Sequence, residues 1–187
     1  AAWFTSVHAA DYYVAPNGVD ANPGTQSEPF GSLQHAQDTA NPGDTVWIRG
    51  GTYIFNDPTT QGARYLSEGE PDPGPGINNV GVLFTTSGAE GLPIRYLAYP
   101  GETPVFDFFA FQPAARIRGF SVQANHLHLK GIEIKGVQQI VTDVNESWCV
   151  RIEGATNPSH NVVEQFNCHH NEGPGIFIKN GGNNLIL

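Results

Sequence analysis

The sequence predicts an all-β fold of the solenoid type, in which short strands stack coil upon coil. Glycine and proline account for 22 and 14 of the 187 residues, and only 14% of the residues are charged. Because glycine and proline interrupt helices and favour turns, this composition predicts many short strands joined by turns. The 39% of hydrophobic residues, including 11 phenylalanines, can form a core and exclude wholesale disorder.

A rough repeat in the second half of the chain is the more specific observation. The segment His126–Ile134 resembles His160–Cys168, and Asn183–Leu187 begins the same pattern again. Between these segments lie two shorter expected strands, Cys149–Glu153 and Gly175–Lys179, which also repeat. A unit of about 23–26 residues with two or three strands is typical of a β-solenoid.

The apolar positions of this repeat predict which side chains face the core. The longer unit, from His126 to His160, is interpreted as an ordinary coil with an insertion near Gln138–Glu146. Apolar and polar residues alternate along each strand, as a strand with one buried face requires. The expected inward residues are Leu127, Leu129, Ile132, Ile134, Val150, Ile152, Val162, Phe166, Ile176 and Ile178. Four asparagines are expected to be either plain turn residues or members of a ladder at the corners of the coils: Asn167, Asn171, Asn180 and Asn183.

The first half of the chain predicts a short helix among further strands. Ser32 is a candidate N-cap for a helix over residues 33–40, whose apolar side chains fall on one face. The segment 56–79, rich in Pro, Gly, Asp and Glu, is expected to be a surface loop. Strands bounded by Gly or Pro turns are expected at residues 12–15, 44–49, 52–55, 80–85, 94–99 and 105–109.

The charge balance excludes some classes of partner. Lys and Arg number 9 against 18 Asp and Glu, for a net charge of −9, and no basic stripe is present. Nucleic acid is therefore not an expected partner. Nor is a membrane, because the sequence has no apolar run long enough to span one as a helix.

The N-terminus and the two cysteines bear on the compartment. Residues 1–10 are interpreted either as a signal-peptide remnant or as a flexible tail or cloning remnant. The first interpretation rests on Val7-His8-Ala9, which has the small-x-small form of a cleavage site. The signal interpretation predicts a secreted protein, and export would permit a disulfide. For Cys149 and Cys168, buried free thiols are favoured over a bridge between them.

Two sets of motifs resemble secreted polysaccharide lyases and together cover most of residues 12–187. The first set is similar to the opening segment of right-handed parallel β-helix proteins, in which a short helix caps the solenoid. It comprises Tyr12–Gly18, Asn22–Thr25, Pro29–Phe30, Leu33, Ala36, Ala40, Pro42–Val46 and Arg49–Tyr53. The second set resembles pectate lyases of polysaccharide lyase family nine. It comprises Pro93–Tyr96, Val105–Phe108, Leu129–Ile134, Asn161–Glu164, Cys168–Gly173, Gly175–Ile176 and Gly181–Asn184.

The resemblance implies calcium-assisted β-elimination on polygalacturonate, with aspartates that bind calcium and a Lys or Arg base. In the family, an acidic Ser-Asp-Asp-Gly-x-Asp type motif is expected downstream of the segment matching Gly181–Asn184. This chain ends at Leu187 and contains no adjacent pair of aspartates. Catalytic and calcium-binding residues are therefore expected beyond Leu187, and none is assigned here. Residues 11–187 are expected to form the cap and first coils of a β-helix domain, truncated at its C-terminus.

Several polar residues are candidates for chemistry within the chain. His169 and His170 are not expected to share a metal, because neighbours on a strand point to opposite faces. His126 and His128 can lie on one face, but a zinc site needs further ligands. Solvated, outward positions are expected for Lys130, Lys135 and Lys179, and packing is favoured over sugar stacking for Trp148 and Tyr65. The scattered acids that stacking of coils can bring near a calcium ion are Asp143, Glu146, Glu153, Glu164 and Glu172.

Two classes of function remain open. The first is the N-terminal portion of a secreted, pectate-lyase-like enzyme that acts with calcium on an acidic plant-type polysaccharide (pectate) and is monomeric when full length. The alternative is a non-catalytic β-helix module that binds polysaccharide or serves at the cell surface. A glycoside hydrolase is a weaker third option, and would require paired carboxylates about 5–9 Å apart.

Overall fold

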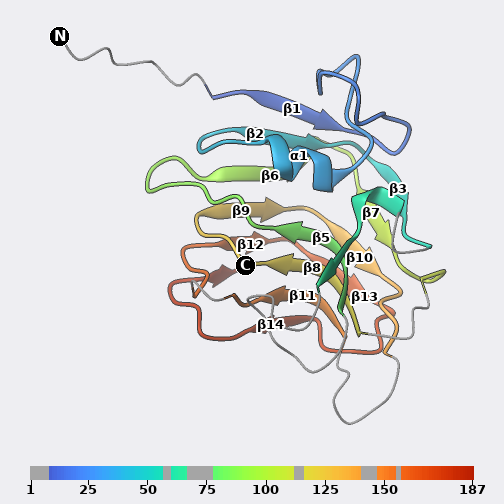
Figure 1. Cartoon of the computed structure of the whole chain (residues 1–187), viewed down its shortest axis with the longest axis vertical. Coiled ribbons are helices and arrows are strands. Elements are labelled where there is room, and N and C mark those ends of the chain that lie inside the picture. Colours follow the sequence, from blue (N-terminus) through green and yellow to red (C-terminus); the bar gives the residue numbers. More distant parts are fainter. Residues whose placement is uncertain (1–8, 57–59, 67–77, 112–115, 140–146, 155–156) are drawn as a thin grey trace.

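The chain winds into a right-handed parallel β-helix of three sheets (Figure 1). The computed structural model describes residues 9–56, 60–66, 78–111, 116–139, 147–154 and 157–187. Among the strands of these residues, all pairs are parallel except β4–β5. No helix in the same ranges has the length and apolar character needed to cross a membrane. The sequence expectation of a β-solenoid with a short N-terminal helix is therefore confirmed.

Each sheet collects strands from successive coils. The first sheet, in spatial order, contains β1 (Asp11–Val14), β2 (Thr45–Ile48), β6 (Ile94–Ala98), β9 (Leu127–Lys130), β12 (Val162–Glu164) and β15 (Leu185–Ile186). The second contains β3 (Gly51–Ile54), β7 (Pro104–Asp107), β10 (Glu133–Lys135) and β13 (Asn167–His169). The third contains β4 (Arg64–Leu66), β5 (Asn78–Phe84), β8 (Arg116–Val122), β11 (Trp148–Ile152) and β14 (Ile176–Ile178). The helices are α1 (Leu33–Thr39) and the short 3₁₀ helix η1 (Thr60–Gly62).

The pairing register confirms the expected repeat. Val162 pairs with His128 of the preceding coil and with Leu185 of the following coil. Val150 pairs with Ile176, which confirms the repeat of the shorter strands. More residues separate β10 from its partner β13 than separate β11 from its partner β14. Only the first of these units contains the connection from β10 to β11, so the expected insertion lies in that connection.

The inward assignment is wrong at one position. Val163, not Val162, is the buried residue of β12, because it pairs with buried Leu129. Val162 is only half-buried and faces outward opposite His128. Ile178 pairs with buried Ile152 and so lies on the expected face, but it is 39% exposed because β14 is an edge strand that is stacked on one side only. Full burial is confirmed for Leu127, Leu129, Ile132, Ile134, Val150 and Ile152, whereas Phe166 and Ile176 are partly buried against the core.

Two strands lie where none was expected. In β8, Gly119 interrupts the alternation of polar and apolar residues, and every residue of the strand is buried, including the polar ones. β4 and η1 lie inside the segment 56–79 that was expected to be a surface loop. Residues 57–59 and 67–77 of that segment lie outside the described part of the chain, as do residues 1–8 of the expected N-terminal tail.

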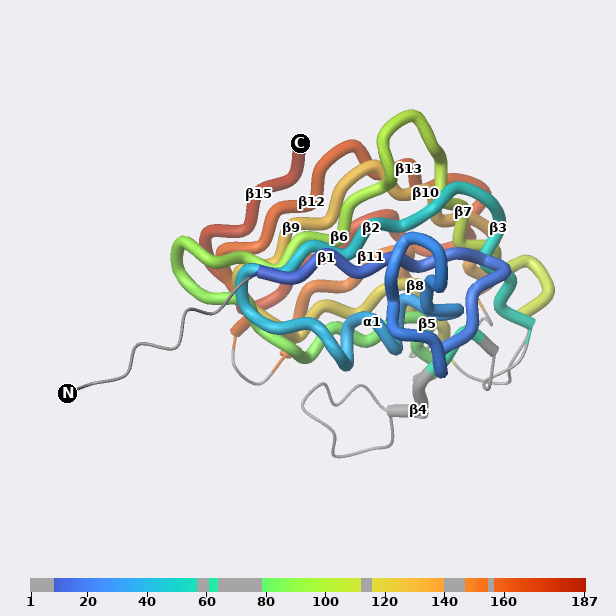
Figure 2. Tube along the Cα trace, turned by 90° about the horizontal axis from the view of Figure 1, so that it is seen from above, coloured from blue at the N-terminus to red at the C-terminus, as the bar shows by residue number. Residues whose placement is uncertain are grey.

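Helix α1 covers the end of the solenoid beside β5 (Figure 2). Ser32 caps it as expected, since its hydroxyl accepts a hydrogen bond from His35 N at 3.1 Å. Buried Gln34 donates to Leu83 O and accepts from Leu83 N, at 3.1 and 2.7 Å. Buried Gln37 accepts hydrogen bonds from the N–H groups of Thr85 and Thr86. The two glutamine amides thus replace a neighbouring strand and satisfy backbone groups of the first coil.

Stacked aromatic rings fill the interior of the first coils. Tyr53 lies on Phe106 of the next coil, with ring centroids 4.8 Å apart and planes 9° apart. Phe55 lies on Phe108 in the same way, at 4.4 Å and 11°. Buried Tyr53 also donates its hydroxyl to the backbone carbonyl oxygens of Val14 and Arg49. The coils are therefore joined by ring stacking inside the solenoid as well as by strand pairing around it.

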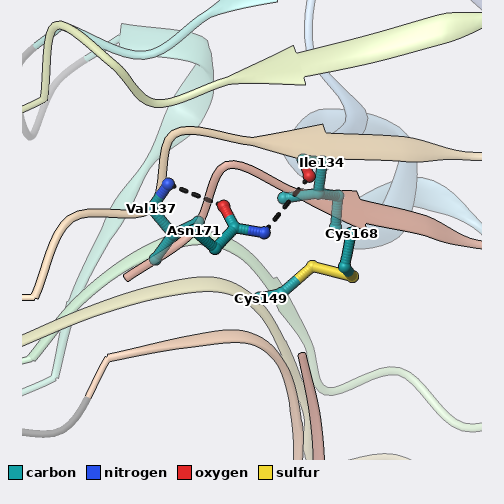
Figure 3. The surroundings of a disulfide bond; sticks show 5 residues. All are labelled: Ile134, Val137, Cys149, Cys168 and Asn171. Atoms are coloured by element: carbon teal, nitrogen blue, oxygen red, sulfur yellow. Dashed lines mark hydrogen bonds between the residues drawn. A yellow bond between two sulfur atoms is a disulfide. The ribbon is translucent and has the colours of Figure 1, made fainter. Parts of the chain in front are cut away.

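A disulfide joins the third sheet to the second, which corrects the expectation of free thiols (Figure 3). Cys149 lies in β11 and Cys168 in β13, with Cα atoms 6.2 Å apart. Nearby, the side chain of Asn171 accepts a hydrogen bond from Val137 N at 2.8 Å and donates to Ile134 O. The expectation missed the bond because Cys149 and Cys168 approach each other only when the chain runs through β12 and turns two corners between them.

The asparagines expected at corners serve in different ways. Asn171 bonds the backbone of the preceding coil, as a ladder residue does. Asn180 and Asn183 adopt left-handed backbone, with φ of 60° and 56°. Asn167 is an exposed residue of β13. The expectation omitted Asn161 and Asn184, which form the more extensive ladder treated in the Discussion.

Candidate functional site

Ion pairs bridge neighbouring coils on the outer face of the first sheet. Parallel register sets Lys130 of β9 opposite Glu164 of β12, and Lys130 Nζ lies 2.7 Å from Glu164 Oε1. His128 Nε2 lies 2.8 Å from the other carboxylate oxygen. The hydrogen bonds from Lys130 and then His128 lower the pKa of Glu164. His128 and Lys130 thus share one face of their strand, and a glutamate of the next coil bridges them.

The other two sheets carry similar pairs on their outer faces. On the second sheet, Lys135 Nζ lies 3.3 Å from Asp107 Oδ2, and His169 Nε2 lies 2.9 Å from Glu133 Oε1. On the third, Lys179 Nζ lies 2.9 Å from Glu153 Oε1.

The three candidate lysines are outward-facing, as expected, but each is also paired with a carboxylate. Their side chains are 40%, 27% and 54% exposed for Lys130, Lys135 and Lys179. The pairs of Lys130 and Lys135 lie at the protein surface and contribute little to stability, whereas Lys179 pairs with the buried carboxylate of Glu153. Each of the three lysines is therefore both at least partly exposed and engaged by a carboxylate of a neighbouring coil.

The expectation that the His169 and His170 side chains point to opposite faces is wrong. Strand β13 ends at His169, and His170 adopts left-handed backbone with φ of 52°. The alternation of a strand therefore stops there, and the two Nδ1 atoms come within 2.5 Å of each other. A nearby ring, that of Phe109, lies 6.3 Å from the His170 ring.

His126 and His128 have different partners, because left-handed backbone at His126 interrupts the alternation of side chains there as well. The φ of His126 is 55°, and its ring stacks on that of His160, one coil later, at 4.8 Å and 6°. Among the residues that the structure describes, no three or more His, Cys, Asp or Glu side chains are arranged to hold a metal ion.

The remaining candidates are structural or lie outside the described residues. Trp148 is only 2% exposed and lies 4.0 Å from the guanidinium carbon of Arg151, which confirms that it packs rather than binds sugar. Glu172 accepts a hydrogen bond from Gln139 N. Asp143, Glu146 and the side chain of Tyr65 are not among the described groups.

Sequence reasoning missed two hollows at the corner between the first and second sheets. One, of about 600 Å³, is lined by residues including Trp47, Tyr99, Lys130 and Gln165. The other, of about 630 Å³, lies next to the N-terminal segment around Pro16. Glu102 and Thr103 line both hollows, so the connection from β6 to β7 separates them. No local sequence pattern points to either hollow, because each is lined by residues that are far apart in the sequence.

Glu102 is held firmly in that connection. Its carboxylate receives two hydrogen bonds from Arg49 Nε, at 2.9 and 3.0 Å, and one from Arg49 Nη2 at 2.7 Å. Gly50 N donates a further bond at 2.6 Å. The Arg49 side chain and then the Gly50 N–H lower the pKa of Glu102, and Glu102 in turn raises the pKa of Arg49.

Comparisons with known proteins agree with this architecture. The chain is 32% identical to pectate lyase L of Dickeya chrysanthemi over 175 residues, which are 91% of this chain and 34% of that protein. It is 32% identical to pectate lyase L of Paenibacillus polymyxa over 176 residues, covering 94% and 32%. The chain thus spans about a third of the length of these curated relatives.

Solved structures give the same result. A rhamnogalacturonan lyase superposes with a TM-score of 0.76 at 31% identity, over 89% of this chain and 38% of that one. Pectate lyase Pel9A superposes with a TM-score of 0.66 at 26% identity, over 97% and 39%. The family model described as the Pel9A-like right-handed β-helix region matches residues 12–187. This chain therefore belongs to the Pel9A-like right-handed β-helix family of polysaccharide lyases.

Proposed function

We propose that this chain forms the N-terminal coils of a secreted lyase that cleaves polygalacturonate by calcium-assisted β-elimination. The observation that carries the proposal is the match of residues 12–187 to the Pel9A-like β-helix, together with curated pectate lyase relatives. A net charge of −9 is compatible with a polyanionic substrate if bound calcium offsets the repulsion between them.

The described residues themselves do not fit a calcium site. The outer-face carboxylates of Glu164, Asp107 and Glu153 are each paired with a lysine. Glu133 is paired with His169, and Glu102 with Arg49. We therefore expect the calcium ligands and the catalytic base in sequence beyond Leu187, and derive no step through the residues described here.

Rhamnogalacturonan is a second candidate substrate. The rhamnogalacturonan lyase has both the higher TM-score and the higher identity of the two solved lyases, 0.76 against 0.66 and 31% against 26%. Both candidates are acidic polysaccharides, so the coarser assignment to a lyase of acidic polysaccharide does not depend on the choice between them.

The test uses the longest natural form of the protein that contains this chain. It is incubated separately with polygalacturonate and rhamnogalacturonan, with calcium or with a chelator, and unsaturated products are followed by ultraviolet absorbance. We expect calcium-dependent product from polygalacturonate, and none from residues 1–187 alone. Product only from rhamnogalacturonan supports the second candidate. Hydrolytic products, or binding without turnover, overturn the lyase proposal in favour of a glycoside hydrolase or a non-catalytic module.

A further inference from the structure

The groove between the first and second sheets has a wall built by a rigid turn. This groove is the hollow of about 600 Å³ that contains Trp47 and Tyr99. In the turn Tyr99-Pro100-Gly101-Glu102, Glu102 N donates to Tyr99 O at 2.9 Å, and Gly101 has a φ of 78°. Proline at the second position and a positive φ at the third are typical of a type II turn. The turn projects beyond the neighbouring coils (Figure 2).

The corners of the next two coils are short and form the floor of the groove. Only Gly131 and Ile132 separate β9 from β10, and only Gln165 and Phe166 separate β12 from β13. Gly131 and Gln165 have φ of 74° and 54°, the left-handed backbone that permits so tight a corner. A projecting wall beside two flat corners leaves an open groove across the coils.

Aromatic rings lie at the wall of this groove. Trp47 and Tyr99 are half-buried, with ring centroids 6.1 Å apart and planes 77° apart. Arg49 lies over the Tyr99 ring at 4.7 Å, and Gln26 donates to the Tyr99 hydroxyl at 3.2 Å. These contacts hold Tyr99 in place before any ligand arrives. Half-buried Trp and Tyr present an apolar ring and a polar edge together, which suits a ligand that is itself amphipathic.

The charged groups of the groove already have partners within the protein. Glu102 is paired with Arg49 and Lys130 with Glu164, and Glu133 is hydrogen-bonded to His169. The exposed amide side chains of Gln165 and Asn167 complete the polar lining. Amides both donate and accept hydrogen bonds, as sugar hydroxyls do. A lining of aromatic rings, amides and charged groups that already have partners, with no unpaired cation among the described residues that form it, complements an uncharged, hydroxyl-rich ligand better than a polyanion.

We propose that the groove lined by Trp47, Tyr99, Gln165 and Asn167 is an accessory binding site for a neutral pyranose oligosaccharide. The C–H face of a sugar ring packs on the aromatic wall, and its hydroxyl groups bond to the amides. A volume of about 600 Å³ is within the usual range for small-molecule sites. The site would anchor the protein on uncharged carbohydrate next to its substrate. It needs no catalysis, so it stands or fails independently of the lyase proposal.

The test measures binding of cellohexaose and of hexagalacturonate to the intact chain by isothermal titration calorimetry. We expect saturable binding of cellohexaose that changes little with salt, and weaker binding of hexagalacturonate. Trp47→Ala should weaken cellohexaose binding about tenfold, the free-energy scale of one aromatic contact. Trp47→Phe should restore most of the affinity, since it restores a ring. Circular dichroism and a thermal melt verify that each variant is folded.

Phe109→Ala is the matched control, because Phe109 is an exposed aromatic residue outside the groove lining, near His170. It should bind cellohexaose like the unmodified protein. Three results would overturn the proposal: no saturable binding of cellohexaose, tighter binding of hexagalacturonate, or equal affinity in a folded Trp47→Ala variant. None of these results bears on cleavage of polygalacturonate by the longer protein, so the two proposals fail separately.

Discussion

The side-chain amide of Asn161 bonds to the backbone N–H of Leu127, one coil earlier. Asn161 Oδ1 accepts that hydrogen bond at 3.0 Å, and Asn161 Nδ2 donates to Ala124 O at 2.9 Å. Asn184 repeats the arrangement one coil later, since its Oδ1 accepts from Asn161 N at 3.1 Å and its Nδ2 donates to Pro158 O. The two asparagines thus form a ladder along the corner that leads into the first sheet.

Replacement of Asn161 with alanine should destabilise the protein by about 3 kcal/mol, because Asn161 is fully buried and its loss leaves a backbone N–H and a backbone carbonyl without their partner. Urea unfolding, followed by circular dichroism, measures the change in free energy. Asn167→Ala, at an exposed position, is the control and should stay within about 0.5 kcal/mol. Equal stability of the two variants would show that the Asn161 ladder contributes nothing.

Reduction of the Cys149–Cys168 disulfide should destabilise the protein by about 3 kcal/mol, because the bond joins residues at a sequence separation of 19 and so restricts the unfolded chain. Unfolding is compared with and without a reducing agent. The double variant Cys149→Ala/Cys168→Ala should be insensitive to reductant, which isolates the effect of the bond. Reactive thiols in denatured, unreduced protein purified under oxidising conditions would argue against the disulfide.

The ion pair of Glu102 should make stability depend on pH. Because Arg49 and Gly50 lower its pKa in the folded state, the pair stabilises the protein above the unfolded pKa of about 4.3 and loses its effect as pH falls through the lower folded value. Glu102→Gln should therefore lower the melting temperature most near pH 7, with the difference from the unmodified protein shrinking below about pH 4. Exposed Glu90→Gln should leave the melting temperature nearly unchanged at every pH. A Glu102→Gln difference that does not vary with pH would contradict the prediction.

Phe106 joins two sets of rings, so its removal should be costly. It stacks on Tyr53 at 4.8 Å and meets Phe120 edge-on at 4.9 Å, and it is 1% exposed. Phe106→Ala should destabilise the protein by about 3–5 kcal/mol, the usual range for truncation of a buried phenylalanine. Phe109→Ala, at a ring that is 46% exposed, should cost less than about 1 kcal/mol. Chemical unfolding distinguishes the two; a small loss at Phe106 would mean that the neighbouring rings close the cavity.

The elements expected from local sequence agree closely with the structure at their ends. The expected helix over residues 33–40 is observed at Leu33–Thr39, and the strand expected at 94–99 is Ile94–Ala98. These segments carry local signals: an N-cap serine, helical spacing of apolar residues, and Gly or Pro at the ends. β8 lacks a clear signal, because Gly119 interrupts its alternation and its arginines and serine are typical of exposed positions although all of them are buried.

The candidate site depended on contacts that sequence spacing does not reveal. The pairing of Lys130 with Glu164 follows from the repeat that sets β9 beside β12, so the sequence contains it in principle. The approach of His170 to His169 depends instead on a single left-handed residue at the end of β13. The groove beside Trp47 requires residues from successive coils, and no local pattern points to it.

The sequence by itself determined the solenoid class, the segments that repeat from coil to coil, and the short N-terminal helix. These features follow from alternation, turn residues and caps, which act over short stretches and recur along the chain. The tertiary structure alone decided that Val163 rather than Val162 faces inward, that Cys149 bonds Cys168, and that Asn161 bonds Leu127. Each of these depends on how one coil lies on the next, because stacking brings together residues that are separated by a whole coil or a corner.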